Sequence, residues 1–182
     1  FRRVLFRSEK FLHIKCRQSG LAPHAIVIVA TIRALKMHGG VALADLGKPD
    51  PEAVARGLEN LAAHLDSASR FGRRVVVALN RFNQDVEEEL QVVHAFCSAR
   101  GVPSATADVF GQGGTGALEL ARLVVDAAAH DPGPLPLLYD ATHTAEEKLH
   151  RIATGIYGAD GVDLAPEALR RLEKFRACGF GA

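Results

Sequence analysis

Short apolar runs alternate along this chain with longer amphipathic stretches. Residues 26–30 and 75–79 are rich in β-branched side chains and apolar at every position, which is typical of parallel strands buried on both faces. Residues 104–107 form a third, weaker run of this kind. Between and after these runs, apolar residues recur at helical spacing. The pattern predicts three strands, each followed by a helix or a polar loop.

Residues typical of helix ends predict where the helices begin and end. Asp50 followed by Pro51 predicts a helix start, and Gly72 predicts its end. A second helix is expected over residues 85–100, with the acidic residues 87–89 at its positive N-terminus. Further on, residues 144–147 form a capping box that opens a helix to about Ile156, and a last helix is expected from Pro166 to Gly179.

Strands alternating with helices predict an α/β fold, with a three-layer parallel sheet and helices on both faces. Right-handed crossovers then bring all the strand-to-helix loops to one edge of the sheet, where open α/β sheets bind ligands. Three segments are expected to converge there, all of them predicted as loops: residues 31–40, 80–85 and 108–116.

Composition narrows the class of protein. The chain has 182 residues, a formal net charge of +1 and 48% hydrophobic residues, and it carries neither a basic stripe nor a long apolar run. This predicts a cytoplasmic protein that binds neither nucleic acid nor membrane. No metal site is expected, because the histidines and three cysteines lack ligand spacing. Residues 1–8 follow no period and are interpreted as a non-native scar.

Two aromatic residues stand in neighbouring loops at the predicted ligand edge. Phe82 follows the second strand, between Asn80 and Asp85, and Phe110 follows the third. Such a pair suits a clamp on a planar ring, since aromatic faces stack on flat ligands. The alternative is that Phe82 only covers the end of the sheet.

Candidate anion-binding groups occur in the same three segments. Backbone N–H groups around Gly113, Gly114 and Gly116 are suited to an anion, although a tight turn explains these glycines equally well. The side chains of the first segment add cationic candidates for a phosphate or carboxylate, with a solvated surface as the alternative. They are Arg33, Lys36 and His38.

Several runs resemble the formate–tetrahydrofolate ligase family. The longest, residues 27–40, is close to the family's V-x-V-A-T-V-R-A-L-K-x-H-G-G. Residues 77–85 resemble V-A-I-N-x-F-x-x-D, and residues 113–121 resemble G-G-x-G-x-x-x-L-A. Residues 152–162 resemble I-A-x-x-I-Y-G-A-D-x-V, and residues 10–17 match a K-F-x-x-[IV]-K-C-R run.

This resemblance implies part of an enzyme of one-carbon metabolism. Such ligases phosphorylate formate with ATP, and nitrogen 10 of tetrahydrofolate attacks the resulting formyl phosphate to give 10-formyltetrahydrofolate. It also implies a P-loop-NTPase-like fold, a homotetramer, Mg with the ATP and a possible monovalent cation. By the match, Phe82 and Phe110 stack on the pteridine, and Asn80 and Asp85 join them in the folate site. Formate, tetrahydrofolate and ATP are the expected small-molecule partners.

The chain departs from the family pattern in ways that bear on activity. Phe110 stands where relatives usually carry Trp, and Asn83 where some carry Pro. The family's phosphate loop and first catalytic arginine are expected upstream, so the isolated fragment is expected to be inactive, and its own catalytic residues are unknown. Residues 9–48 are then the end of a nucleotide-binding domain, residues 49–135 a folate-binding domain and residues 136–182 a truncated helical continuation.

Two other classes of protein stay open at this stage. Residues 80–83 loosely resemble the guanine motif of nucleotide-binding switch NTPases, although the second and fourth positions of that motif do not match. A non-catalytic folate-binding or scaffold module is the other alternative. The latter predicts that replacing Phe82 affects stability alone.

Overall fold

A computed structural model describes residues 8–180 of the chain. It divides into two compact units, Ala22–Pro134 and a second unit formed by the described residues on either side of it. The predicted scar lies outside the described residues except for Ser8, which begins helix α1 (Ser8–Lys10). All three strands lie within the unit Ala22–Pro134.

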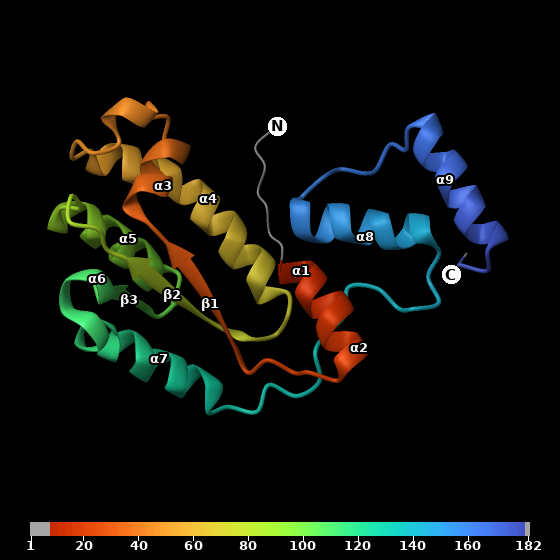
Figure 1. The fold of residues 1–182 in the computed structure, drawn as a ribbon, viewed down its shortest axis with the longest axis horizontal. Coiled ribbons are helices and arrows are strands. Elements are labelled where there is room, and N and C mark those ends of the chain that lie inside the picture. Colours follow the sequence, from red (N-terminus) through yellow and green to blue (C-terminus); the bar gives the residue numbers. More distant parts are fainter. Residues whose placement is uncertain (1–7, 181–182) are drawn as a thin grey trace. The chain divides into compact units, whose positions relative to one another are not determined.

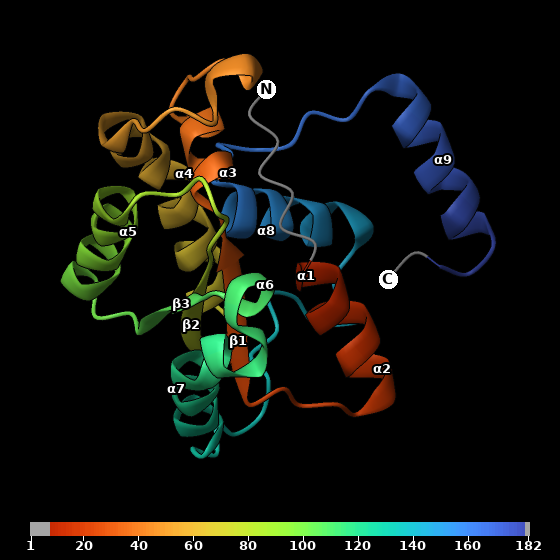
Figure 2. The ribbon, with the colours of Figure 1, turned by 60° about the vertical axis from the view of Figure 1, so that its left-hand side comes forward.

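The unit Ala22–Pro134 contains a parallel sheet in the order β1-β2-β3. The strands are β1 (Ala25–Ala30), β2 (Arg74–Asn80) and β3 (Ser104–Ala107). Helices α4 (Pro51–Ser69) and α5 (Glu87–Ala99) lie on one face, and α7 (Leu118–Ala128) lies on the other (Figures 1 and 2). The prediction of a parallel α/β sheet is confirmed, and this unit has helices on both faces.

The core lies between the sheet and the helices α4 and α5. Side chains at helical spacing in both helices meet the alternate side chains of β2 that point to this face. Each such large apolar side chain contributes about 1.5–3 kcal/mol when fully buried. The residues are Val54, Leu58, Leu61 and Leu65 of α4, Leu90, Val93 and Cys97 of α5, and Val77 and Leu79 of β2.

The prediction that β1 is buried on both faces was wrong for one face, which is exposed. Val27 is 41% exposed and Val29 is 66% exposed, whereas Ala30 is buried. The reason is the strand order: among the described residues β1 pairs with β2 alone and stands at the edge of the sheet. Its partner β2 is central, and Val76 and Ala78 on its α7 side are buried.

Two predicted loops contain helical segments. Residues 31–40 hold the helix α3 (Ile32–His38), whose N-cap Thr31 accepts a hydrogen bond from the Ala34 N–H at 3.2 Å. Residues 108–116 hold α6 (Val109–Gln112) and most of the 3-10 helix η3 (Gly113–Ala117). A 3-10 segment η2 (Leu43–Asp45) lies between α3 and α4. The prediction of plain loops was wrong because side-chain caps at Thr31 and Asp108 support short helices at the starts of α3 and α6.

Helices α3 and α4 pack against each other through glycine. A Cβ atom added at Gly57 of α4 would lie 2.0 Å from the carbonyl oxygen of Leu35, and one added at Gly39 would lie 2.0 Å from that of Ala53. Only glycine lets the two backbones approach this closely. The position of α3 on the unit, and of the side chains it carries, therefore depends on these two residues.

The second unit is helical. It contains α1, the π-helix η1 (Phe11–Cys16), α2 (Arg17–Ser19), α8 (Ala145–Tyr157) and α9 (Pro166–Ala177). The predicted capping box is confirmed, since Thr144 Oγ1 accepts from the Glu147 N–H and Glu147 accepts from the Thr144 N–H. Cys16 is buried, which favours an inert thiol over a reactive one.

His13 joins two segments of this unit as a neutral imidazole. Its Nε2 accepts the N–H of Leu138 at 2.8 Å, so its Nδ1 carries the proton and donates to the Glu9 carbonyl at 3.1 Å. The ring also stacks on Tyr139, with centroids 5.1 Å apart. Burial lowers the pKa of His13 below its usual 6.5, and the positive charge of Arg17 lowers it further.

Stability is therefore expected to fall on acidification through this histidine. The unfolded chain binds the proton near pH 6.5 and the folded chain only at lower pH, so the contribution is complete above about pH 6.5 and is lost as the pH falls toward the folded pKa. Urea unfolding of the protein and of His13→Phe across this range measures it. The difference between the two should shrink as the pH falls, and a difference independent of pH would contradict the neutral-imidazole assignment.

Candidate functional site

A pocket of about 870 Å³ lies in the unit Ala22–Pro134, where β2 and β3 end. This is the edge at which the parallel topology predicts ligand binding. Two of the three predicted segments supply most of its wall, and the third contributes one cation. The lining consists of residues 80–85 together with Arg33, Leu46, Val109 and Phe110.

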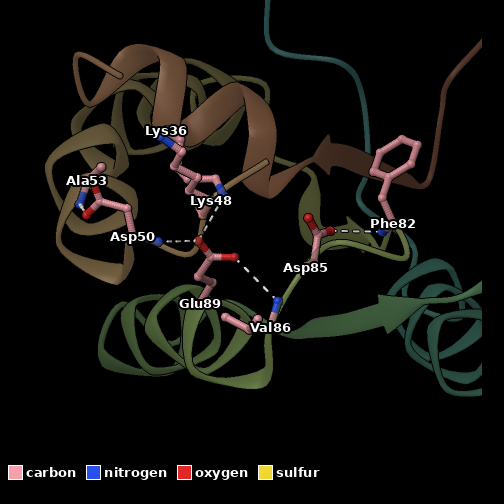
Figure 3. A network of polar contacts seen from close by, with 8 residues as sticks. All are labelled: Lys36, Lys48, Asp50, Ala53, Phe82, Asp85, Val86 and Glu89. Atoms are coloured by element: carbon pink, nitrogen blue, oxygen red, sulfur yellow. Dashed lines mark hydrogen bonds and ion pairs between the residues drawn. The ribbon is translucent and has the colours of Figure 1, made fainter. Parts of the chain in front are cut away.

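The loop after β2 presents Phe82 to the pocket. Asp85 closes this loop as a turn: its Oδ2 accepts the Phe82 N–H at 2.8 Å, and its own N–H donates to the Phe82 carbonyl at 3.0 Å (Figure 3). Arg81 continues the sheet by one hydrogen bond, from its N–H to the Ala107 carbonyl. Phe82 is left 50% exposed.

Asp85 stands in a mixed electrostatic environment. Burial raises the pKa of its carboxyl group, and the nearby charge of Glu89 raises it too. The hydrogen bond from the Phe82 N–H and the charges of Lys36 and Arg81 act in the opposite direction. A partly buried carboxylate that borders a pocket is suited to accept N–H groups of a ligand.

Phe110 projects from the short helix α6 and is 87% exposed. Asp108 caps this helix, since its Oδ1 accepts the Gly111 N–H at 2.9 Å and its Oδ2 accepts the Gln112 side-chain amide at 3.0 Å. These hydrogen bonds lower the pKa of Asp108 and favour its ionised form. The structure therefore brings the two predicted aromatic residues, Phe82 and Phe110, to the wall of one pocket.

The glycines after Phe110 serve different purposes. Gly113 has φ +61°, which favours glycine, and a Cβ at Gly116 would lie 2.1 Å from the Asp108 carbonyl oxygen. Gly114 has open space where a side chain would be. The turn geometry thus explains two of the three predicted anion-binding glycines, and none of the three lines the pocket.

The three predicted cations of residues 31–40 lie in different environments in the structure. Arg33 is exposed and lines the pocket. His38 is exposed at the end of α3 and is not part of the pocket lining. Lys36 is 1% exposed, and its Nζ donates to Glu89 Oε1 and to the Lys48 carbonyl, both at 2.9 Å. The prediction of Lys36 as a cation for a phosphate or carboxylate ligand is corrected: its ammonium is held inside the unit by the Glu89 carboxylate and the Lys48 carbonyl.

Several residues of this site were not predicted from the sequence. Leu46, Arg81, Asn83, Gln84 and Val109 line the pocket beside the predicted residues. The buried Glu89 was interpreted only as part of an acidic helix start. No capping-box signature marks it in the sequence, because the N-cap residue three positions earlier is Val86 and not Ser, Thr, Asp or Asn.

Among residues 8–180, no group of three or more His, Cys, Asp or Glu side chains is arranged to hold a metal ion. Over the same range, no helix has both the length and the apolar character that crossing a membrane requires.

Comparison with known proteins decides the family. Residues 5–182 match the family described as formate–tetrahydrofolate ligase. The chain belongs to this family. A formate–tetrahydrofolate ligase of Bacillus licheniformis is 45% identical over 173 residues, and one of Symbiobacterium thermophilum is 46% identical over 175 residues. These alignments cover 95% and 96% of the chain but 31% of each relative, so the chain spans about a third of the length of the ligases it matches.

Proposed function

We propose that this chain forms the tetrahydrofolate-binding part of an ATP-dependent ligase that converts formate and tetrahydrofolate to 10-formyltetrahydrofolate. The observation that carries the proposal is the pocket at the sheet edge, whose wall includes two exposed aromatic rings, Phe82 from the loop after β2 and Phe110 from α6. Flat heterocycles bind well between such rings. The membership in the ligase family supports a pteridine as the heterocycle.

The polar lining supports the same ligand. Asp85 and Asn80 stand beside Phe82, and a carboxylate and an amide are suited to hydrogen-bond the edge of a pteridine ring. Arg33 supplies a positive charge at the pocket wall for the carboxylates of the folate tail or for a phosphate. Anion binding by His38, Gly113, Gly114 and Gly116 stays a prediction outside the pocket lining.

The chemistry of the whole ligase follows from the family resemblance. Formate takes the terminal phosphoryl group of ATP, and nitrogen 10 of tetrahydrofolate then attacks the carbon of formyl phosphate and displaces phosphate. The residues of this chain would hold and orient tetrahydrofolate for that attack. ATP, its Mg and a monovalent cation would be bound mainly by parts of the ligase outside this chain.

Several features of the whole protein are proposed on the same basis. They are a P-loop-NTPase-like fold with its phosphate loop outside this chain, a homotetramer and a cytoplasmic location. The proposed domain limits are residues 9–48 for the end of the nucleotide-binding domain, residues 49–135 for the folate-binding domain and residues 136–182 for the helical continuation.

Replacing Phe82 tests the proposal. In the intact ligase, Phe82→Ala is expected to raise the KM for tetrahydrofolate about tenfold, because losing one stacked face removes roughly 1.4 kcal/mol of binding. The KM for ATP should stay near that of the wild type. Steady-state kinetics with each substrate varied in turn measure both constants.

A second phenylalanine provides a matched control. Phe175 is 56% exposed, close to the exposure of Phe82, but lies in α9 of the other unit. Phe175→Ala should leave both constants unchanged. If Phe82→Ala changes the KM of both substrates equally, or lowers stability alone, the pteridine site is refuted and a nucleotide site or a scaffold becomes the better explanation.

A further inference from the structure

Glu89 is fully buried at the start of α5 and gathers three N–H donors. Its Oε1 accepts the Lys36 ammonium at 2.9 Å and the Asp50 N–H at 2.8 Å, and its Oε2 accepts the Val86 N–H at 3.4 Å. The exposed fraction of its side chain is 0%. Figure 3 shows the carboxylate between these partners.

These donors come from three separate segments that meet beside the pocket. Lys36 belongs to α3, one turn after the pocket residue Arg33. Asp50 caps α4, and its Oδ1 accepts the Ala53 N–H at 2.8 Å. Val86 directly follows Asp85, which closes the turn that carries Phe82. One carboxylate thus connects the helix of Arg33, the start of α4 and the loop of Phe82.

Stability alone is a poor explanation for this arrangement. Taking a carboxylate and an ammonium out of water costs several kcal/mol per ion, and apolar side chains of similar volume often replace such pairs without loss of stability. One attested role of such a pair is to fix the geometry of the segments that it connects. Here the imposed geometry concerns two segments that supply opposite chemical features of the pocket, an aromatic face and a cation.

We infer that Glu89 is a positioning residue, which sets the placement of Phe82 and Arg33 at the pocket through the hydrogen bonds to Val86 and Lys36. The inference rests on the proposed tetrahydrofolate function. Glu89 is buried and outside the pocket lining, so its effect on the ligand is indirect. The charge of Glu89 also acts on the carboxyl group of Asp85, which lies between Phe82 and Val86 in the sequence.

The test removes the network while keeping the volume of both side chains. The double variant Lys36→Met/Glu89→Met in the intact ligase is expected to unfold closer to the wild-type midpoint in urea than Lys36→Met does, because neither charge remains buried, although the Asp50 and Val86 N–H groups lose their acceptor. Its KM for tetrahydrofolate should rise about tenfold, equivalent to about 1.4 kcal/mol, because Phe82 and Arg33 are no longer held in place. The KM for ATP should change little, and this split is a readout that a merely structural role would not produce.

The control is the adjacent, exposed Glu88 on the same helix, for which Glu88→Met should leave both constants unchanged. If the double variant unfolds too easily for kinetics, Glu89→Gln keeps the shape and part of the hydrogen bonding, and the same split should appear at smaller size. An unchanged KM for tetrahydrofolate in a folded variant, beside a raised one in Phe82→Ala, overturns the positioning role alone. Unchanged values in both variants overturn the proposed function together with it.

Discussion

Lys36→Met alone is expected to destabilise the protein by about 3–5 kcal/mol, because it leaves a buried carboxylate without its counter-charge. Glu89 would keep two backbone N–H donors, from Asp50 and Val86, but lose the ammonium at 2.9 Å. The double variant Lys36→Met/Glu89→Met should lose much less, since neither charge remains to be solvated. Urea unfolding of the wild type, both single variants and the double variant measures the coupling as a double-mutant cycle.

Lys48 provides the contrast within the same network. Its carbonyl accepts from Lys36, but its own ammonium is exposed and pairs with Asp45 at 2.7 Å. Lys48→Met should therefore leave the unfolding midpoint unchanged within error. Equal losses from Lys36→Met and Lys48→Met would mean that burial of the pair has no energetic consequence, contrary to the contacts described for Glu89.

Gly57→Ala is expected to destabilise the protein by about 3 kcal/mol, at the upper end of what overpacking costs. The new methyl group would lie 2.0 Å from the Leu35 carbonyl oxygen, and that oxygen belongs to backbone, which cannot rotate away. Helix α3 would have to move off α4 and take Arg33 with it. Thermal or urea unfolding gives the stability loss, and the KM for tetrahydrofolate should rise in any variant that stays folded.

A glycine-to-alanine substitution at Gly155 should have the opposite effect on stability. Gly155 lies inside α8, and a Cβ there would meet only Leu138 side-chain atoms at 3.7 Å and 4.0 Å, which is ordinary contact. Gly155→Ala should stabilise by about 0.5–1 kcal/mol, because alanine favours the helix and restricts the unfolded chain. A stabilising Gly57→Ala would show that α3 and α4 do not approach as closely as described.

Much of the fold could be predicted from local signals. Apolar β-branched runs marked β1 and β2, and Asp50 before Pro51 marked the start of α4, where Asp50 does cap the helix. The edge position of β1 could not be predicted, because strand order is set by contacts distant in the sequence. The helix α3 was missed although Thr31 was a usable cap, since seven residues with three cations show no clear apolar period.

The site residues likewise divide into those that the sequence pattern could predict and those whose position depends on distant contacts. Phe82, Phe110 and Arg33 were predicted at the ligand edge because strand-to-helix loops must meet there, and they do line one pocket. Lys36 was assigned to the same edge by its charge alone. Its burial depends on Glu89, 53 positions away, and a pairing across that distance leaves no local pattern. Their roles toward tetrahydrofolate remain predictions for the kinetic experiments above.

The register of the sheet has a consequence for how the chain assembles. β1 pairs with β2 from Ala25 opposite Arg74, whereas β2 pairs with β3 from Val77 opposite Ser104. The first pairing closes a loop nearly twice as long, at an additional entropic cost of about 0.5 kcal/mol. β2, α5 and β3 are therefore expected to come together before β1 joins them. Of these three strands, the one synthesised first would be the last to find its partner.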